Sequence, residues 1–188
     1  GSNLLGMGFT FDDRNEATAS IAEMHAIIAK SPKSQERILP FIGGEEVNSS
    51  PTQSHHRFVI NFGHLSLEEA AAWPELLSIA EQRVKPERER SARDTYRKNW
   101  WQFAEKAIDL YKSIAGHTRC LVTSQVSTHP VFAWQPTGRV FGHTLYVFTS
   151  DQDGFFAIIQ SRVHEYWARS FGSSMKDDQI GRASCRER

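Results

Sequence analysis

The eight histidines are the first residues that could do chemistry, as metal ligands or as acid–base catalysts. His55 and His56 are adjacent, so their rings cannot share one face of a helix. The others are scattered, with no HExxH motif and no CxxC partner to complete a metal-binding spacing. We therefore predict no metal site and interpret these residues as ordinary surface or core histidines: His25, His64, His117, His129, His143 and His164.

Motifs of nucleophilic or phosphate chemistry are equally missing from the sequence. It has no Gly-x-Ser-x-Gly elbow, no GxxxxGK[ST] phosphate loop and no GxGxxG after a strand. The paired acids Glu45-Glu46 and Asp177-Asp178 are adjacent, so their carboxylates point apart and are typical of solvated pairs or helix caps. The sequence predicts no catalytic residue, and we expect this chain by itself not to be an enzyme.

A basic stretch covers residues 83–98, just before Trp100-Trp101. Acidic residues are interleaved with the cations, so one interpretation is a solvated helix face. The other is a strip that contacts DNA phosphates, which would fix register without reading sequence. The candidate phosphate contacts are Arg83, Lys85, Arg88, Arg90, Arg93, Arg97 and Lys98.

The block from residue 124 to residue 144 has a different character, because donors and acceptors are dense within turn-rich β structure. Such side chains suit the edges of bases in the major groove. The same residue types also make local hydrogen bonds in turns, which is the alternative interpretation. The base-reading candidates are Gln125, Ser127, Thr128, His129, Arg139, His143 and Thr144.

Composition limits what these residues can do. The chain has 188 residues, 39% of them hydrophobic, and a formal net charge of zero, so it resembles an ordinary globular domain and not a non-specific nucleic-acid binder. Any DNA contact must therefore come from a local patch. The sequence contains neither an apolar run of membrane-spanning length nor a signal peptide at its start, and we expect a cytoplasmic protein without membrane partners.

The last ten residues, 179–188, differ in pattern from everything before them. They look like a translated sequencing adapter, and we predict a non-native tail after a domain at 1–178. The tail holds three Arg and one Glu, which leaves 19 basic and 21 acidic residues in the domain. Cys185 lies in the tail, Cys120 is predicted to be a small buried hydrophobe, and Gly1-Ser2 is either native or a tag remnant.

The elements that must position these side chains alternate between helix and strand periodicity. We predict strands at 6–11, 57–62, 118–124, 131–134 and 139–148, and helices at 17–30, 66–83, 102–114 and 155–172. A short helical turn is predicted at 36–41, and Ser66 with Glu69 forms a capping box. This order predicts an α+β fold with a small mixed or antiparallel sheet and flanking helices.

Taken in order, several stretches resemble the target-recognition domain of MmeI-like type IIG and IIL restriction–modification enzymes. The matching stretches, as they stand in the sequence, are Gly-Met-Gly-Phe (6–9), Ile-Leu-Pro-Phe-Ile-Gly-Gly-Glu-Glu-Val-Asn-Ser-Ser-Pro (38–51), Arg-Phe-Val-Ile-Asn-Phe-Gly (57–63), Val-Lys-Pro-Glu-Arg (84–88), Trp-Trp-Gln-Phe-Ala (100–104), Pro-Thr-Gly (136–138), Gln-Ser-Arg-Val-His-Glu-Tyr-Trp-Ala-Arg (160–169) and Phe-Gly-Ser-Ser-Met-Lys-Asp-Asp (171–178).

This resemblance implies a module that reads double-stranded DNA, with Ser173, Ser174 and Lys176 as further base-reading candidates. It also implies a parent chain with an adenine N6 methyltransferase domain and a nuclease domain, which would use S-adenosylmethionine and Mg²⁺. The Asn-Pro-Pro-Tyr motif of that methyltransferase is not in this sequence, so the resemblance implies a truncated piece that needs no cofactor itself. Two alternatives stay open, a fragment with residual enzyme function and a protein-interaction scaffold using the aromatic strips at Trp100-Trp101 and Tyr166-Trp167.

Overall fold

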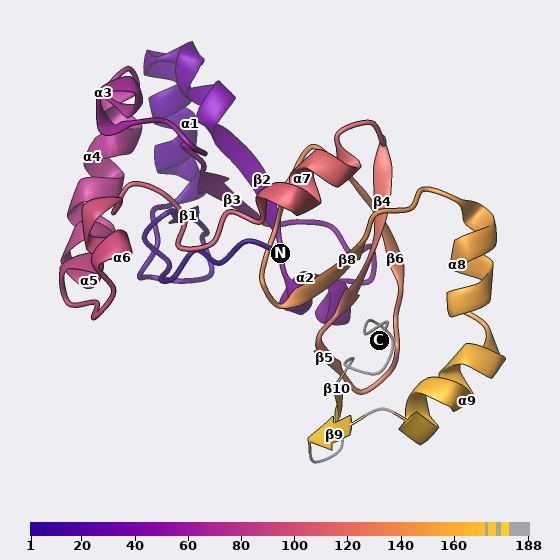
Figure 1. Ribbon diagram of the computed structural model, residues 1–188. Helices are drawn as coiled ribbons and strands as arrows, with labels where there is room; N and C mark the ends of the chain where they lie inside the picture. Colours follow the sequence, from indigo (N-terminus) through magenta and orange to yellow (C-terminus); the bar gives the residue numbers. More distant parts are fainter. Residues whose placement is uncertain (172, 176–177, 181–188) are drawn as a thin grey trace. The chain divides into compact units, whose positions relative to one another are not determined.

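The computed structural model describes residues 1–171, 173–175 and 178–180, and it divides into two compact units (Figure 1). The N-terminal unit consists of Ser2–Phe41 and His56–Lys106. The C-terminal unit consists of Gly1, Ile42–His55 and the chain from Ala107 onward. Each unit has its own sheet and helices, which confirms the predicted α+β class.

The sheet of the N-terminal unit has the strand order β1-β3-β2 and is antiparallel throughout. Its strands are β1 (Thr10–Phe11), β2 (Ile38–Ile42) and β3 (Arg57–Ile60). Val59 of the central strand β3 pairs with Thr10 of β1 on one side and with Leu39 of β2 on the other. The unit's helical segments are α1 (Ile21–Lys30), the 3-10 helix η1 (Pro32–Arg37), α3 (Leu67–Ala70), α4 (Pro74–Arg83), α5 (Lys85–Glu89) and α6 (Asp94–Lys98).

Local signals fix where these helices begin. Ser66 accepts a hydrogen bond from the Glu69 amide, and the Glu69 carboxylate accepts one from the Ser66 amide at 2.7 Å, so the predicted capping box is confirmed. Pro74 occupies the first turn of α4, where its missing N–H has no helical partner to lose. The helix predicted over 66–83 is therefore two helices, α3 and α4.

In the C-terminal unit the main sheet has the order β6-β4-β8 and is antiparallel. Its strands are β4 (Arg119–Ser124), β6 (Ala133–Pro136) and β8 (Leu145–Phe148). Three short strands, β5 (Val126–Ser127), β10 (Asp178–Ile180) and β9 (Ser173–Met175), form a second antiparallel sheet in that order. A further short strand, β7 (Val140–Phe141), lies between β6 and β8 in the sequence and is not part of the β6-β4-β8 sheet. The helices are α2 (Gly44–Ser49), α7 (Ile108–Ile114), α8 (Asp153–Ile159) and α9 (Arg162–Phe171).

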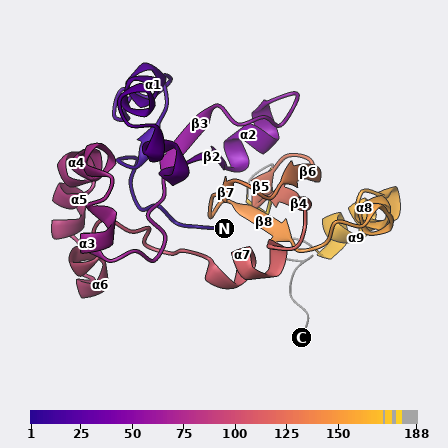
Figure 2. The same ribbon diagram turned by 90° about the horizontal axis from the view of Figure 1, so that it is seen from above.

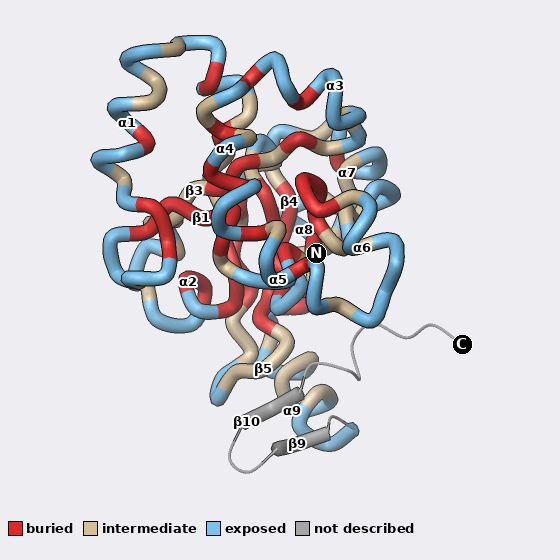
Figure 3. Tube along the Cα trace, turned by 90° about the vertical axis from the view of Figure 1, so that its left-hand side faces the viewer, coloured by how far each residue is buried: buried red, intermediate tan, exposed pale blue. Residues whose placement is uncertain are grey.

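Most of strand β4 is buried (Figure 3). Its side chains alternate between two cores. Cys120 and Val122 pack with Val47 of α2 and Ile114 of α7. Leu121 points the other way and packs with residues that include Ile159 of α8. Figure 2 accordingly shows α7 and α8 on different sides of this sheet.

Five more sequence predictions need correction. The helical turn expected at 36–41 is wrong: the segment continues from η1 into strand β2, whose residues Ile38 to Phe41 pair with β3. The helix expected at 102–114 begins only at Ile108, after Ala107 with φ 49°. The strand expected at 139–148 turns back at Gly142, so it becomes β7 and β8.

The fourth correction concerns the strand expected at 6–11, of which only Thr10 and Phe11 pair as β1. Leu5 and Gly6 have φ values of 50° and 100°, which turn the chain before the strand. The helix expected over 155–172 is also interrupted, and it forms α8 and α9. Among the described residues, no helix is long and apolar enough to cross a membrane.

Candidate nucleic-acid interface

Most of the predicted base-reading residues converge at one end of the β6-β4-β8 sheet. Because β6 and β8 run antiparallel to β4, they begin where β4 ends, with Leu145 opposite Ser124 and Ala133 opposite Val122. The segments 124–129 and 142–144 therefore meet at the carboxyl end of β4, and we call them the β4-end cluster. Figure 1 shows β5 and α2 beside this end of the sheet. The cluster contains Gln125, Ser127, Thr128, His129, His143 and Thr144.

Gln125 ties the two segments of the β4-end cluster together. Its backbone amide donates to the Thr144 carbonyl at 2.9 Å, and its side-chain Nε2 donates to the His143 carbonyl at 2.6 Å. Both bonds fix the 142–144 turn against the end of β4. The Gln125 amide group is thus partly committed to holding the cluster's backbone.

The cluster contains two exposed histidines. His129 and His143 are exposed, and within the described part of the chain no hydrogen bond or ion pair engages either ring. Each ring carries a donor and an acceptor whose assignment depends on tautomer. By contrast, the Ser127 hydroxyl donates to the His129 carbonyl at 2.6 Å, which is a local turn bond. The side chains best placed to meet a ligand are therefore the two histidines.

Arg139 does not join the cluster. Pro136 pairs with Arg119 at the opposite end of the sheet, and the turn that carries Arg139 follows directly. Its Nη1 donates to Gln135 Oε1 at 2.6 Å, and burial lowers the pKa of its guanidinium. We therefore leave Arg139 out of the base-reading set.

Three further base-reading candidates lie at or beyond the limit of the described residues. The backbone of Ser173 and Ser174 belongs to β9, which pairs with β10, but their side chains are outside the described part. Lys176 lies outside the described residues altogether.

Sequence reasoning missed the contribution of α2 to the cluster. Asn48 Nδ2 donates to Ser124 Oγ at 3.2 Å and to the Val126 carbonyl at 3.0 Å. The Gly44 amide donates to Thr144 Oγ1 at 2.8 Å. The available signals were the Gly43-Gly44 break and the polar loop that begins at Asn48, but the sequence did not say which strand they face.

The basic stretch lies in the N-terminal unit, on α4, α5 and α6. Five of its seven cations are exposed, and Lys85 is half-buried. Arg88 is buried, with 1% of its surface exposed. Its Nη2 donates to the Leu4 carbonyl at 2.6 Å and lies 3.4 Å from the Gln102 carbonyl, and burial lowers the pKa of its guanidinium. Arg88 therefore supports the fold, and the prediction that it contacts phosphate is corrected here.

Several cations of the stretch already have side-chain partners close by in the sequence. Lys85 forms an ion pair with Glu81 at 2.7 Å, which raises the pKa of the lysine, and Arg97 pairs with Asp94. Arg93 Nη1 contacts the Tyr96 hydroxyl at 2.6 Å. These contacts agree with the solvated-face interpretation, yet exposed pairs of this kind are weak and can be exchanged for phosphate.

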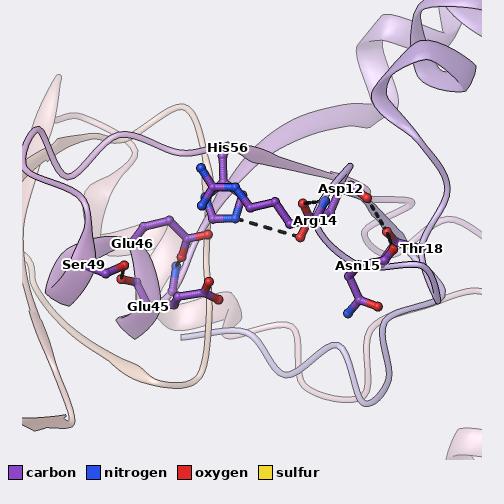
Figure 4. A network of polar contacts seen from close by, with 9 residues as sticks. Asp12, Arg14, Asn15, Thr18, Glu45, Glu46, Ser49 and His56 are labelled. Carbon is purple, nitrogen blue, oxygen red and sulfur yellow. Dashed lines mark hydrogen bonds and ion pairs between the residues drawn. The ribbon is translucent and has the colours of Figure 1, made fainter.

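A separate polar network surrounds Asp12 in the N-terminal unit (Figure 4). Asp12 Oδ1 accepts from the Arg14 amide at 2.9 Å, and Asp12 Oδ2 lies 3.9 Å from His56 Nε2. Thr18 Oγ1 donates to the Asp12 carbonyl at 2.7 Å. These bonds close the 12–18 turn, and no described group of three or more His, Cys, Asp or Glu is placed to hold a metal ion.

Of the paired acids Glu45-Glu46, Glu46 acts in helix capping, one of the two interpretations given from sequence, while Glu45 is exposed. Glu46 is buried, and its Oε2 accepts from the Gly43 amide at 2.8 Å at the start of α2. Ser49 Oγ donates to the Glu45 carbonyl within the same helix (Figure 4).

The two aromatic strips of the scaffold alternative differ in exposure. Trp100 and Trp101 are buried, and Trp101 Nε1 donates to the Leu65 carbonyl at 2.9 Å, so this strip is core. Tyr166 and Trp167 of α9 are exposed. Only the second strip is available to a partner.

Comparison with known proteins gives a consistent result. The sequence matches the family described as MmeI, target recognition domain, over residues 2–180. The match includes Gln179 and Ile180, two residues of the stretch set apart above as a tail. Among solved structures, the fold is similar to the type IIL restriction–modification enzyme MmeI, described in complex with DNA, with a TM-score of 0.73 and 18% identity. The alignment covers 98% of this chain and 23% of that one. No curated protein matches.

Proposed function

Because the chain belongs to the MmeI target recognition domain family, we propose that it reads the base sequence of double-stranded DNA as one module of a larger restriction–modification enzyme. The observation that carries the proposal is the β4-end cluster. Six of the seven base-reading candidates from the 124–144 block meet there, and His129 and His143 present exposed rings. Such rings can donate to or accept from base edges in the major groove.

The exposed part of the basic stretch supplies the phosphate contacts in this proposal. It comprises Arg83, Arg90, Arg93, Arg97 and Lys98, together with the half-buried Lys85 and without the buried Arg88. These cations would position the duplex without reading it. Since the whole chain has a formal net charge of zero, we expect other domains of the parent enzyme to share the phosphate binding.

Chemistry belongs to those other domains. We propose that the parent methylates adenine N6 with S-adenosylmethionine and cleaves DNA with Mg²⁺ in the bacterial cytoplasm. The described residues offer no fit for Mg²⁺, because no group of three acidic, His or Cys side chains comes together. The sequence likewise has no glycine-rich loop for the methyl donor. This chain would select the site at which the parent flips out its adenine.

Fluorescence anisotropy with a pool of random duplexes, at two salt concentrations, tests the proposal. The bound fraction is then recovered and sequenced. We expect a salt-sensitive signal that enriches one short motif. The double variant His129→Ala/His143→Ala should lose the enrichment and keep the salt slope, whereas Arg90→Ala should keep the enrichment and reduce the slope. Binding without enrichment of any motif would contradict sequence reading by this chain.

The scaffold alternative makes a different prediction for the same measurement. If the chain only joined other proteins, no duplex would bind even at low salt. Its remaining support is the exposed strip of α9 with Tyr166 and Trp167. Substituting both by serine would then remove partner binding, while a DNA-reading module would retain its motif.

A further inference from the structure

The helix α2 contacts both segments of the β4-end cluster, one at each end of the helix. At its start, the Gly44 amide donates to Thr144 Oγ1 at 2.8 Å, in the 142–144 turn. Four residues later, Asn48 Nδ2 donates to Ser124 Oγ and to the Val126 carbonyl in the other segment. One rigid helical turn therefore spans the two backbone segments that carry the candidate readers.

Asn48, Ser124 and Val126 are joined to one another by hydrogen bonds. Ser124 Oγ donates to the Val126 carbonyl at 2.8 Å, so that carbonyl accepts both from Ser124 and from Asn48. Both hydrogens of the Asn48 side-chain amide are thus committed to the 124–126 segment. The segment is fixed directly before Ser127 and His129.

Close packing at Gly44 strengthens this connection. A Cβ built on Gly44 would lie 2.7 Å from Ser124 Oγ and 3.4 Å from Thr144 Oγ1. A side chain at this position would force the Ser124 hydroxyl to move, because the α2 backbone approaches both segments of the cluster. The start of α2 is itself held by the buried Glu46, which accepts from the Gly43 amide.

We propose that Asn48 is a positioning residue for base reading: through Ser124 and Val126 it sets the geometry of the 124–129 segment without contacting a base itself. This rests on the proposed DNA-reading function. Polar readers must be held to within a fraction of an ångström to discriminate bases, so support from a neighbouring element is needed. Removing the support should relax discrimination more than it weakens general binding.

The test compares Asn48→Ala with wild type in the duplex selection, using the 188-residue chain. Each well-placed base contact contributes about 1–3 kcal/mol of discrimination, so we expect at least a tenfold fall in the affinity ratio between the selected motif and a scrambled duplex. Preference should relax at two or more positions of the motif. The salt slope and the melting temperature should change little, because Asn48 is exposed. Asn48→Gln, which keeps the amide donor, should restore part of the ratio.

Ser49→Ala is the matched control, since Ser49 lies beside Asn48 and, among the described residues, its hydroxyl bonds only within α2, to the Glu45 carbonyl at 2.6 Å. It should leave the ratio unchanged. Loss of preference at a single motif position in Asn48→Ala would overturn the proposal, because it would make Asn48 a direct reader. An unchanged ratio would overturn it too. If the wild-type chain selects no motif, the proposed DNA-reading function is contradicted. That outcome is distinct from failure of the Asn48 proposal, in which the wild-type chain selects a motif and Asn48→Ala selects it equally well.

Discussion

Replacing Arg88 by methionine or alanine should destabilise the protein without removing a DNA contact. The side chain is 1% exposed, and its guanidinium donates to the Leu4 carbonyl at 2.6 Å, with the Gln102 carbonyl at 3.4 Å. The Nε and Nη1 atoms of Arg88 have no hydrogen-bond partner among the described residues. Arg88 thus connects Leu4, near the start of the chain, to Gln102, which follows α6, within the N-terminal unit.

The size of the effect follows from these contacts. Arg88→Ala leaves a buried carbonyl unpaired, which costs about 1–3 kcal/mol, and it removes a packed aliphatic stem worth about 2 kcal/mol. Relief of the desolvated cation offsets part of this. We expect a loss of about 2–4 kcal/mol in the free energy of unfolding for Arg88→Ala. Arg88→Met keeps the stem and should lose about half as much.

Urea titration followed by tryptophan fluorescence measures this loss, and Arg90→Ala is the matched control two residues along the chain. Arg90 is exposed, so its removal should change the free energy of unfolding by less than about 0.5 kcal/mol. DNA binding should be affected by the Arg90 variant and not by the Arg88 variant. Arg90→Ala should lower the salt slope of binding by about one, and Arg88→Met should leave that slope unchanged. A lower slope with full stability in Arg88→Met would refute the reasoning, since it would mean that Arg88 reaches a phosphate.

Three further predictions concern single groups. Burial raises the pKa of the Cys120 thiol to about 11 from an ordinary 9.0, so the folded state holds its proton longer than the unfolded state. The free energy of unfolding should then fall as pH rises from about 9 to about 11, and thiol labelling located by mass spectrometry should reach Cys120 only after unfolding. The pKa of Asp151 is lowered by its hydrogen bond to His117. In an NMR titration, His117→Ala should return that pKa toward 3.8. Ser66→Ala should lower the free energy of unfolding by about 1 kcal/mol in urea titration, through loss of the capping box with Glu69, and a variant as stable as wild type would contradict the cap.

Local sequence signals were sufficient wherever a short stretch decides its own conformation. Ser66 and Glu69 predicted a helix start because both partners of the cap lie within four residues. The strand predicted at 118–124 is present as β4, and Cys120 was correctly placed in a core. The resemblance of ordered stretches along the chain identified the family, which the match over residues 2–180 confirms.

Other features depended on which distant segments pair. Residues 36–41 were predicted as a helical turn, and pairing with β3 made Ile38 to Phe41 a strand. The seven cations in one stretch could not be sorted from sequence, because the buried one, Arg88, is set apart by tertiary contacts that include the Leu4 carbonyl 84 residues away.

The candidate site shows the same division between sequence and tertiary structure. Its residue types were visible in the sequence, since donors and acceptors are dense between residues 124 and 144. Their grouping was not visible, because antiparallel register sent Arg139 to one end of the sheet and the two histidines, His129 and His143, to the other. The support from Asn48, 76 residues before Ser124, is likewise a tertiary contact. Sequence determined which chemistry was available, and the pairing of strands far apart in the chain decided which side chains share a surface.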